Sequence, residues 1–230
     1  MGSKTRVVPA TEHPPPAASP RRGYRSPLRV QRAAETRSAL LVAGRRLFTS
    51  SGWSGTGMRD VAAEAGVATE TVYSYFPSKR ALFQAVVDEA VVGDTEPIAL
   101  AERAEFAAIG RGSRVERIAA AARLITGVHV RTAAFAKVLL EAASTDREIA
   151  AILEATRERR RRDVVAAIAL VVGSDANEVE RDGVWALTSP EVYLLLIESS
   201  GWTIDRYEAW MAETLDRVLP PSSKEGRAPR

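Results

Sequence analysis

The amino-acid sequence predicts an all-α protein, with a small N-terminal module of three helices followed by a larger helical domain. Apolar residues recur at three- and four-residue spacing along much of the 230-residue chain. No run of residues keeps the period-two alternation of a half-buried strand. Between Thr56 and Lys79, two short helical patterns flank a glycine, which is the arrangement of a helix-turn-helix.

The first part of the chain, residues 1–34, is predicted to be a disordered basic arm. Residues 1–32 hold six of the twelve prolines and show no helical periodicity. Five arginines lie in the part of the arm next to the folded chain: Arg21, Arg22, Arg25, Arg29 and Arg32. Such an arm can follow a DNA backbone or enter a minor groove. A solvated tail with weak nonspecific attraction is an equally good interpretation.

Three helices follow the arm. An apolar stripe predicts the first over Glu35–Ser51, with Gly52 at its end. The second is predicted over Met58–Ala65, where Gly66 supplies the left-handed residue that ends a helix without steric cost. The third is predicted over Thr69–Phe76.

The third helix has one apolar face and one polar, aromatic face. Val72 and Phe76 lie four residues apart and would anchor it to the module. The opposite face offers hydroxyl, carboxylate and phenol groups, which suit a DNA major groove that admits one α-helix. The predicted DNA-binding residues are Thr56, Thr69, Glu70, Thr71, Tyr73, Ser74, Tyr75 and Lys79.

Three of these residues have competing interpretations. Tyr73 does not align with the apolar stripe, which favours DNA contact over packing. Lys79 begins the next helix, where a phosphate would neutralise both the cation and the helix terminus, although simple exposure is the alternative. Glu70 can accept a hydrogen bond from cytosine N4, or it can be a first-turn acid that the helix dipole favours.

The rest of the chain is predicted to be helical. Pro77 and Ser78 begin a helix through Val92, and residues 93–97 break the pattern. Local start and stop signals then predict seven helices: Ile98–Ile109, a helix capped by Ser113 and Glu116 that runs to Ile125, Val128–Ala143, Asp146–Val172 with Thr145 and Glu148 as its capping box, Asn177–Leu187, Pro190–Ser199, and a helix capped by Thr203 that runs to Leu219. Residues 221–230 are predicted to be a disordered tail.

Charge and composition narrow the possible functions. Residues 1–90 hold 13 Lys and Arg against 7 Asp and Glu, whereas residues 91–230 hold 19 against 22, which favours a polyanionic partner at the N-terminal end. The chain has no cysteine, so we expect no disulfide and no thiolate metal site. No signal peptide or membrane span is predicted, and we expect a cytoplasmic protein without membrane partners. Phosphate-loop, zinc-protease and nucleophile-elbow motifs are missing from the sequence, so we predict no enzyme and no cofactor.

The helical domain offers only weak candidates for a ligand site, and for His129 a core or surface role is the simpler interpretation. Arg160 alone among its neighbouring arginines follows the apolar stripe of its helix. It could pair with an acidic ligand, with Glu154 or Asp163, or with another subunit. The candidate residues are Arg123, His129, Phe135, Arg160 and Trp185.

Residues 36–90 resemble the TetR family of bacterial transcriptional regulators. The resemblance rests on Thr56-Gly57-Met58-Arg59-Asp60-Val61-Ala62, Ala65-Gly66-Val67, Thr71-Val72-Tyr73-Ser74-Tyr75-Phe76 and Lys79. Gly57, Ala68 and Glu70 depart from the usual family pattern. The first two lack a capping hydroxyl, so we expect Thr56 and Thr69 to cap the helices instead.

This resemblance implies a function. Residues 35–92 would be a DNA-binding domain, and residues 93–220 a regulatory and dimerisation domain. The chain would bind double-stranded operator DNA as a homodimer, usually as a repressor, with its late helices paired in a four-helix bundle. An unidentified small-molecule effector would shift the helix from Ser78 to Val92. The alternative is a nonspecific or architectural DNA-binding protein that uses the basic arm.

Overall fold

The computed structural model describes residues 2, 27–94, 98–174 and 176–221, and this part of the chain is helical without a strand. The elements in order are α1 (Pro27–Ser51), α2 (Met58–Glu64), α3 (Thr69–Tyr75), α4 (Lys79–Val92), the 3₁₀-helix η1 (Leu100–Glu102), α5 (Ala104–Ala108), α6 (Arg114–Ala143), α7 (Arg147–Val172), α8 (Glu178–Leu187), α9 (Pro190–Leu194), the π-helical turn η2 (Leu195–Ser199) and α10 (Ile204–Val218). No helix in the described ranges is both long and apolar enough to cross a bilayer.

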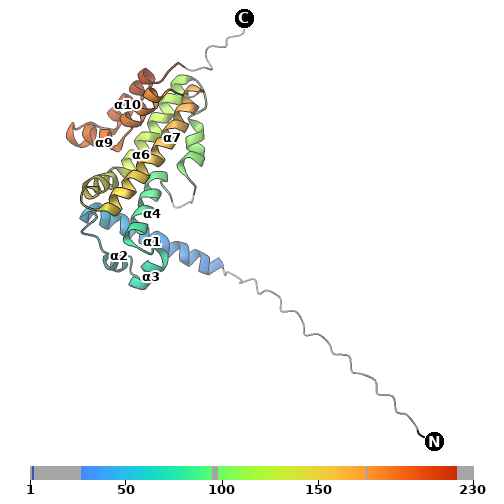
Figure 1. Ribbon diagram of the computed structural model, residues 1–230, viewed down its shortest axis with the longest axis vertical. Coiled ribbons are helices and arrows are strands. Elements are labelled where there is room, and N and C mark those ends of the chain that lie inside the picture. The colour runs from blue at the N-terminus through green and yellow to red at the C-terminus, as the bar shows by residue number, and fades with distance from the viewer. Residues whose placement is uncertain (1, 3–26, 95–97, 175, 222–230) are drawn as a thin grey trace.

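The molecule is elongated, with the long helices α6 and α7 running side by side between its two ends. Helices α1, α2 and α3, which we call the N-terminal module, lie at one end, and α9 and α10 lie at the other (Figure 1). Helix α4 leads from the module to the long pair. The predicted architecture, a three-helix module followed by a larger helical domain, is confirmed.

Two apolar cores stabilise this arrangement. The first joins the module and α4 to the adjoining ends of α6 and α7, through residues such as Phe83, Phe135 and Ile149. The second joins the far parts of α6 and α7 to α8, α9 and α10, through residues such as Ile168 and Tyr207. Because α6 and α7 contribute to both cores, a rigid movement of either helix would affect the packing at both ends of the molecule.

Helix α4 is also tied to the long pair by two arginines. The guanidinium of Arg131 on α6 donates from Nε to the carbonyl of Ala90 and from Nη2 to that of Val91, both at 3.0 Å. These bonds satisfy carbonyl groups at the C-terminus of α4, which have no partner within the helix. Arg159 on α7 pairs with Asp88 at 2.7 Å.

Helix α1 begins earlier than the sequence pattern indicated. It starts at Pro27 rather than near Glu35, so Arg29 and Arg32 lie on exposed helical turns and not in an arm. Gln31 donates to Glu35 within this extension at 2.9 Å, which is a helix-stabilising pair four residues apart. Once a helix exists, each added residue gains a hydrogen bond without a new nucleation cost, so a polar segment can extend it. The predicted arm over residues 3–26 and the tail over residues 222–230 lie outside the described residues.

Three later boundaries also differ from prediction. The predicted helices that ended at Ile125 and began at Val128 form one continuous helix, α6, because its interior Gly127 does not break it. The predicted helix over residues 98–109 is divided into η1 and α5 by the extended backbone of Arg103. The N-cap of α7 is Asp146 and not Thr145, since the Asp146 carboxylate accepts from the amides of Glu148 and Ile149.

Several predicted caps are confirmed. Ser113 and Glu116 form the capping box of α6, and Thr203 caps α10. The apolar stripe of α10, with Tyr207 and Met211, is buried inside the subunit. These side chains therefore belong to the core of the subunit, and the pairing of the late helices between subunits stays a prediction.

Candidate functional site

Helices α2 and α3 form the predicted helix-turn-helix. Gly66 ends α2 at φ +67°, a left-handed conformation that costs glycine little. The amide of Val67 donates back to the carbonyl of Ala62 at 3.0 Å and closes the turn. Val72 and Phe76 are both buried against the module core, as their spacing indicated. The other side of α3 therefore faces away from the core of the module.

The caps of these two helices differ from our expectation. Helix α2 begins after Gly57, whose amide donates to the Asp60 side chain at 2.9 Å. Helix α3 begins after Ala68, which supplies no side-chain cap, and Thr69 lies inside the helix. Thr56 is only 2% exposed and its hydroxyl donates to the carbonyl of Gly52, so the predicted DNA contact of this side chain is contradicted.

The outward face of α3 carries most of the other predicted residues. Glu70, Tyr73 and Ser74 are exposed, with Tyr73 at 50%. The Ser74 hydroxyl donates to the carbonyl of Thr71 at 2.7 Å, so it retains only acceptor capacity toward a ligand. The half-buried residues on the flanks are Thr69, Thr71 and Tyr75.

Tyr75 contributes partly to packing. It lies against the apolar core of the module while part of its side chain remains exposed. A tyrosine in this position can present its phenol group to a phosphate while its ring supports the helix.

Lys79 at the start of α4 is neither freely exposed nor a simple helix-terminus cation. Its Nζ lies 4.2 Å from the centre of the Trp53 ring, a cation–π contact. Burial lowers the pKa of Lys79, and the nearby Asp146 carboxylate partly offsets this effect. The N-cap of α4 is Ser78, which accepts from the amide of Ala81 at 3.1 Å.

Two further exposed cations lie on the helices before and after α3, and our sequence analysis did not select them. Arg59 on α2 and Arg80 on α4 are both exposed, and the described residues offer neither of them an acid within salt-bridge distance. Arg59 lies one residue after the predicted start of the second helix, and Arg80 lies one residue after Lys79. These positions could have identified both arginines as candidates.

At the other end of the molecule, a buried polar cluster joins α6, α9 and α10. His129 is 4% exposed, and its Nδ1 lies 3.0 Å from the hydroxyl of Tyr207. Tyr193 packs against both rings, with centroids 5.2 Å from His129 and 4.9 Å from Tyr207. Burial, and then the charge of Arg160, lower the pKa of His129 to about 3, so the imidazole is neutral near pH 7.

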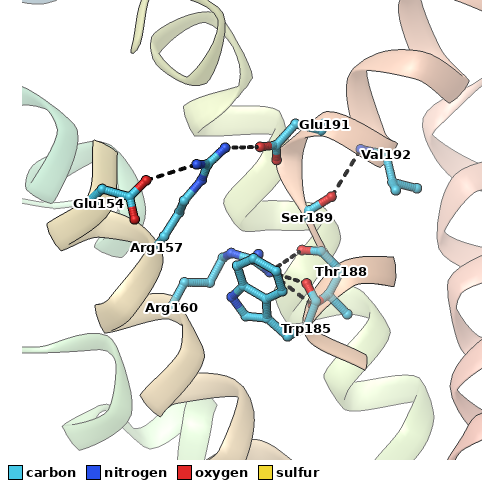
Figure 2. A network of polar contacts seen from close by, with 8 residues as sticks. All are labelled: Glu154, Arg157, Arg160, Trp185, Thr188, Ser189, Glu191 and Val192. Carbon is cyan, nitrogen blue, oxygen red and sulfur yellow. Dashed lines mark hydrogen bonds and ion pairs between the residues drawn. The ribbon is translucent and has the colours of Figure 1, made fainter. Parts of the chain in front are cut away.

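Arg160 on α7 binds the C-terminal end of α8 (Figure 2). Its Nη1 donates to the carbonyl of Trp185 at 2.6 Å and to that of Thr188 at 3.2 Å. The guanidinium also lies 4.6 Å from the Trp185 ring. The expected pairing of Arg160 with Glu154 or Asp163 is therefore wrong, because helix-end carbonyls offer acceptors that are closer. Burial lowers the pKa of Arg160 to about 10.

The neighbouring Arg157, and not Arg160, forms ion pairs with carboxylates. It bridges Glu154 at 3.0 Å and Glu191 at 3.1 Å, and so ties α7 to α9 (Figure 2). A cleft of about 220 Å³ opens beside it, lined by Glu154, Arg157, Glu158, Arg161 and Trp185. The indole Nε1 of Trp185 is buried without a hydrogen-bond partner in the described residues.

The five candidate ligand residues are only partly brought together. His129, Arg160 and Trp185 meet around the end of α8. Phe135 instead belongs to the core next to the module, where its ring lies 6.3 Å from that of Phe83. Arg123 is exposed on α6. No group of three or more acidic or histidine side chains in the described ranges could hold a metal ion.

Comparison with known proteins gives similarity at two levels. The family described as bacterial regulatory proteins, tetR family, matches residues 40–86, which include the helix-turn-helix. A curated relative, the HTH-type transcriptional activator FasR of Mycolicibacterium smegmatis, is 37% identical over 76 residues, or 33% of this chain and 32% of the relative. The chain thus matches about a third of the length of that relative.

Solved structures extend the similarity to the whole fold. A putative TetR-family transcriptional regulator from Rhodococcus sp. superimposes with a TM-score of 0.62 at 19% identity, over 81% of this chain and 100% of the other. A putative TetR-family regulator from Syntrophomonas wolfei gives 0.61 at 17% identity, over 81% and 95%. The multidrug binding protein EbrR, complexed with ethidium, gives 0.53 at 19% identity, over 80% and 98%.

Proposed function

We propose that the chain is a transcriptional regulator of the TetR family, a ligand-responsive repressor that binds operator DNA as a homodimer. Residues 35–92 are the proposed DNA-binding domain and residues 93–220 the proposed regulatory and dimerisation domain. We expect no catalytic activity. The observation that carries the proposal is the outward face of α3, with Glu70, Tyr73 and Ser74 exposed on a helix that Val72 and Phe76 anchor.

Three features support the proposal that α3 contacts the bases of DNA. The helix is short and projects polar groups, and a recognition helix contacts bases with its N-terminal residues. Exposed cations lie on the two helices that flank α3 in the sequence, Arg59 on α2 and Arg80 on α4, and such cations can contact phosphates. The half-buried Lys79 lies next to the same face.

One general principle and one observation support a homodimer. Operators with two-fold symmetry are bound by proteins with the same symmetry, with half-sites about 34–36 Å apart. Apolar side chains also remain exposed at the end of the molecule opposite the module, notably Leu195 at 60% and Ile204 at 45%. We place the dimer contact on α9, η2 and the start of α10 for this reason.

The proposed effector site is the cleft beside Trp185, together with the polar cluster around Arg160 and His129. The buried indole N–H of Trp185 is a donor without an acceptor among the described residues, and such a group is costly unless a ligand or water satisfies it. An effector that prefers one arrangement of α7 against α8 would shift the population of DNA-binding-competent dimers.

Selection of bound sequences from randomised duplexes tests the proposal. We expect one preferred two-fold-related sequence, bound more tightly than a scrambled duplex at the same salt concentration. Equal affinity for both duplexes at every salt concentration would support the architectural alternative. A reporter gene behind the selected operator separates repression from the activation for which the matched relative is named.

A further inference from the structure

One hydrogen bond ties the N-terminal module to the start of α7. The indole Nε1 of Trp53, in the loop after α1, donates to Oδ2 of Asp146 at 2.8 Å. The Trp53 ring is itself fixed by aromatic packing, with centroids 6.0 Å from Phe48 and 5.6 Å from Phe83. The bond therefore connects the aromatic core of the module to the first turn of a helix 93 residues further along the chain.

The two carboxylate oxygens of Asp146 have separate partners. Oδ1 accepts from the amides of Glu148 at 2.9 Å and Ile149 at 3.2 Å and so caps α7. Oδ2 accepts from Trp53, and this bond is the largest cause of the lowered pKa of Asp146. An asparagine has only one carbonyl oxygen, so it can cap α7 or accept from Trp53 but cannot do both.

Lys79 completes the contact. Its ammonium group lies over the ring of Trp53, and the charge of Asp146 favours its protonated form. Lys79 is also the first residue of α4, immediately after the helix that faces DNA. The same aromatic ring thus touches both the cation at the DNA side and the carboxylate at the start of α7.

Helix α7 extends this contact to the far end of the molecule. It is a continuous helix of 26 residues, about 39 Å long at 1.5 Å per residue. Ile149 and Ile152 belong to the core next to the module, and Ile168 and Val171 belong to the second core. A shift of α7 at the cluster around Arg160 would therefore also displace Asp146.

The geometry points to Asp146 as a positioning residue for DNA binding, which holds Trp53 and Lys79 against α7 and so sets the orientation of the module. This inference rests on the proposed function, because it presupposes sequence-specific DNA binding. A module held in one orientation loses less conformational freedom on binding two half-sites than a loosely attached module.

The test uses the full chain and four variants. Asp146→Asn keeps an oxygen for the α7 cap and loses the charge and the Trp53 bond, while Trp53→Phe removes only the indole donor and part of the ring. The double variant completes a cycle. Asp182→Asn is the matched control, because it removes a carboxylate that pairs with Arg161, further along α7 than the module contact. Affinity is measured by fluorescence anisotropy for the selected operator and for a scrambled duplex.

We expect Asp146→Asn and Trp53→Phe each to weaken operator binding about fivefold, the worth of one net hydrogen bond, and the double variant to lose no more than that. Scrambled-duplex affinity and its salt slope should not fall, because both variants leave every lysine and arginine of the chain in place. Asp182→Asn should bind as the unmodified chain does.

The other possible outcomes separate failure of the proposed function from failure of this inference. If the unmodified chain prefers no sequence, the proposed function and this inference both fail. If it prefers one and the two variants bind the operator with full affinity, only the inference fails. Losses that multiply in the double variant would mean that the two residues act independently and not through their shared bond, which contradicts the inference. A lower melting temperature with an unchanged ratio of operator to scrambled affinity would show a role in stability alone. If Asp146→Asn does not fold, Trp53→Phe, which leaves the α7 cap intact, decides alone.

Discussion

Glu70 has two possible roles in α3, one in helix stability and one in base recognition. It is exposed in the first turn of the helix, and the N-cap before it, Ala68, offers no side-chain acceptor. A first-turn carboxylate therefore gains ~0.3–1 kcal/mol from the helix dipole. Close to phosphates the same carboxylate is repelled, so in a complex it needs a base amino group as donor, and cytosine N4 is the match.

Substitution of Glu70 separates these two roles. Glu70→Ala should raise affinity for random duplex, where only repulsion is lost, and should cut discrimination at one base pair per half-site by ~1–3 kcal/mol. Randomised-site selection with both proteins measures this. Identical base preferences at every position, together with a slightly lower melting temperature, would leave Glu70 only its role at the helix dipole.

His129 gives the fold a pH dependence of known sign. Its pKa is about 3 in the folded protein and 6.5 when unperturbed, so the unfolded chain binds the proton more readily. Its contribution to stability is full above pH 6.5 and is lost progressively as pH falls toward 3. The slope is at most about 1.4 kcal/mol per pH unit for this one proton.

Urea unfolding at pH 7 and at pH 5 measures this effect. The unmodified chain should lose about 2 kcal/mol more than His129→Gln between the two pH values, because the variant cannot take up this proton. Titrating carboxylates act in both proteins, so they cancel in the comparison. Equal losses in the two proteins would mean that His129 is accessible to protons in the folded state.

Two glycines inside helices differ in the room that they leave for a side chain. A Cβ on Gly44 of α1 would lie 3.2 Å from Cγ2 of Val86, a fully buried residue of α4. A Cβ on Gly127 of α6 would lie 3.3 Å from Nη1 of Arg131, the guanidinium nitrogen that takes no part in the bonds to Ala90 and Val91. The first glycine allows close packing of α1 on α4, whereas the second has no such neighbour in the core.

The two alanine variants should therefore differ in sign. Gly127→Ala should stabilise the fold by up to ~1 kcal/mol, the difference in helix propensity between the two residues. Gly44→Ala gains the same propensity but overpacks the α1–α4 contact at a cost of about 1–3 kcal/mol, so a net loss is expected. Thermal unfolding of both variants is the measurement. A stabilised Gly44→Ala would mean that α4 can move away from α1 at little cost.

Local signals in the sequence account for the elements that were predicted correctly. Gly52 and Gly66 both have positive φ, and Ser113 and Glu116 pair within one turn, so each could be recognised from its neighbours. The errors come from contacts between distant residues. The Asp146 carboxylate accepts from Trp53, and Arg160 reaches the carbonyl of Trp185, and no spacing rule indicates either partner.

The same distinction holds for the candidate site. The outward face of α3 follows from helical periodicity, so the exposure of Tyr73 was predictable. The burial of Thr56 was not, because it depends on how the loop after α1 folds back to let Thr56 donate to Gly52. The position of Lys79 over Trp53 likewise requires the packing of α4 on the module.

At the scale of the whole molecule, the surface opposite the module is the one that we propose for the dimer contact. Leu195 is 60% exposed on η2, and Ile204 is 45% exposed at the start of α10. The amide of Trp202 donates to the carbonyl of Leu196 at 3.0 Å, which folds the chain between these two elements back on itself. A second copy of the chain would cover this apolar surface, and a two-fold axis there would present two modules to one operator.

Glutamate substitutions on this apolar surface test the proposed dimer. The unmodified chain should sediment as a dimer at micromolar concentration, and Leu195→Glu with Ile204→Glu should give a folded monomer, because a dimer would bury two carboxylates without partners. Val115→Glu is the control, since Val115 is 76% exposed at the start of α6, and it should leave the dimer intact. The monomeric variant should also bind the operator more weakly than the dimer, because the two half-sites are then bound independently. A monomeric unmodified chain would refute the homodimer itself, whereas a dimer that survives both glutamates would move the interface to another face.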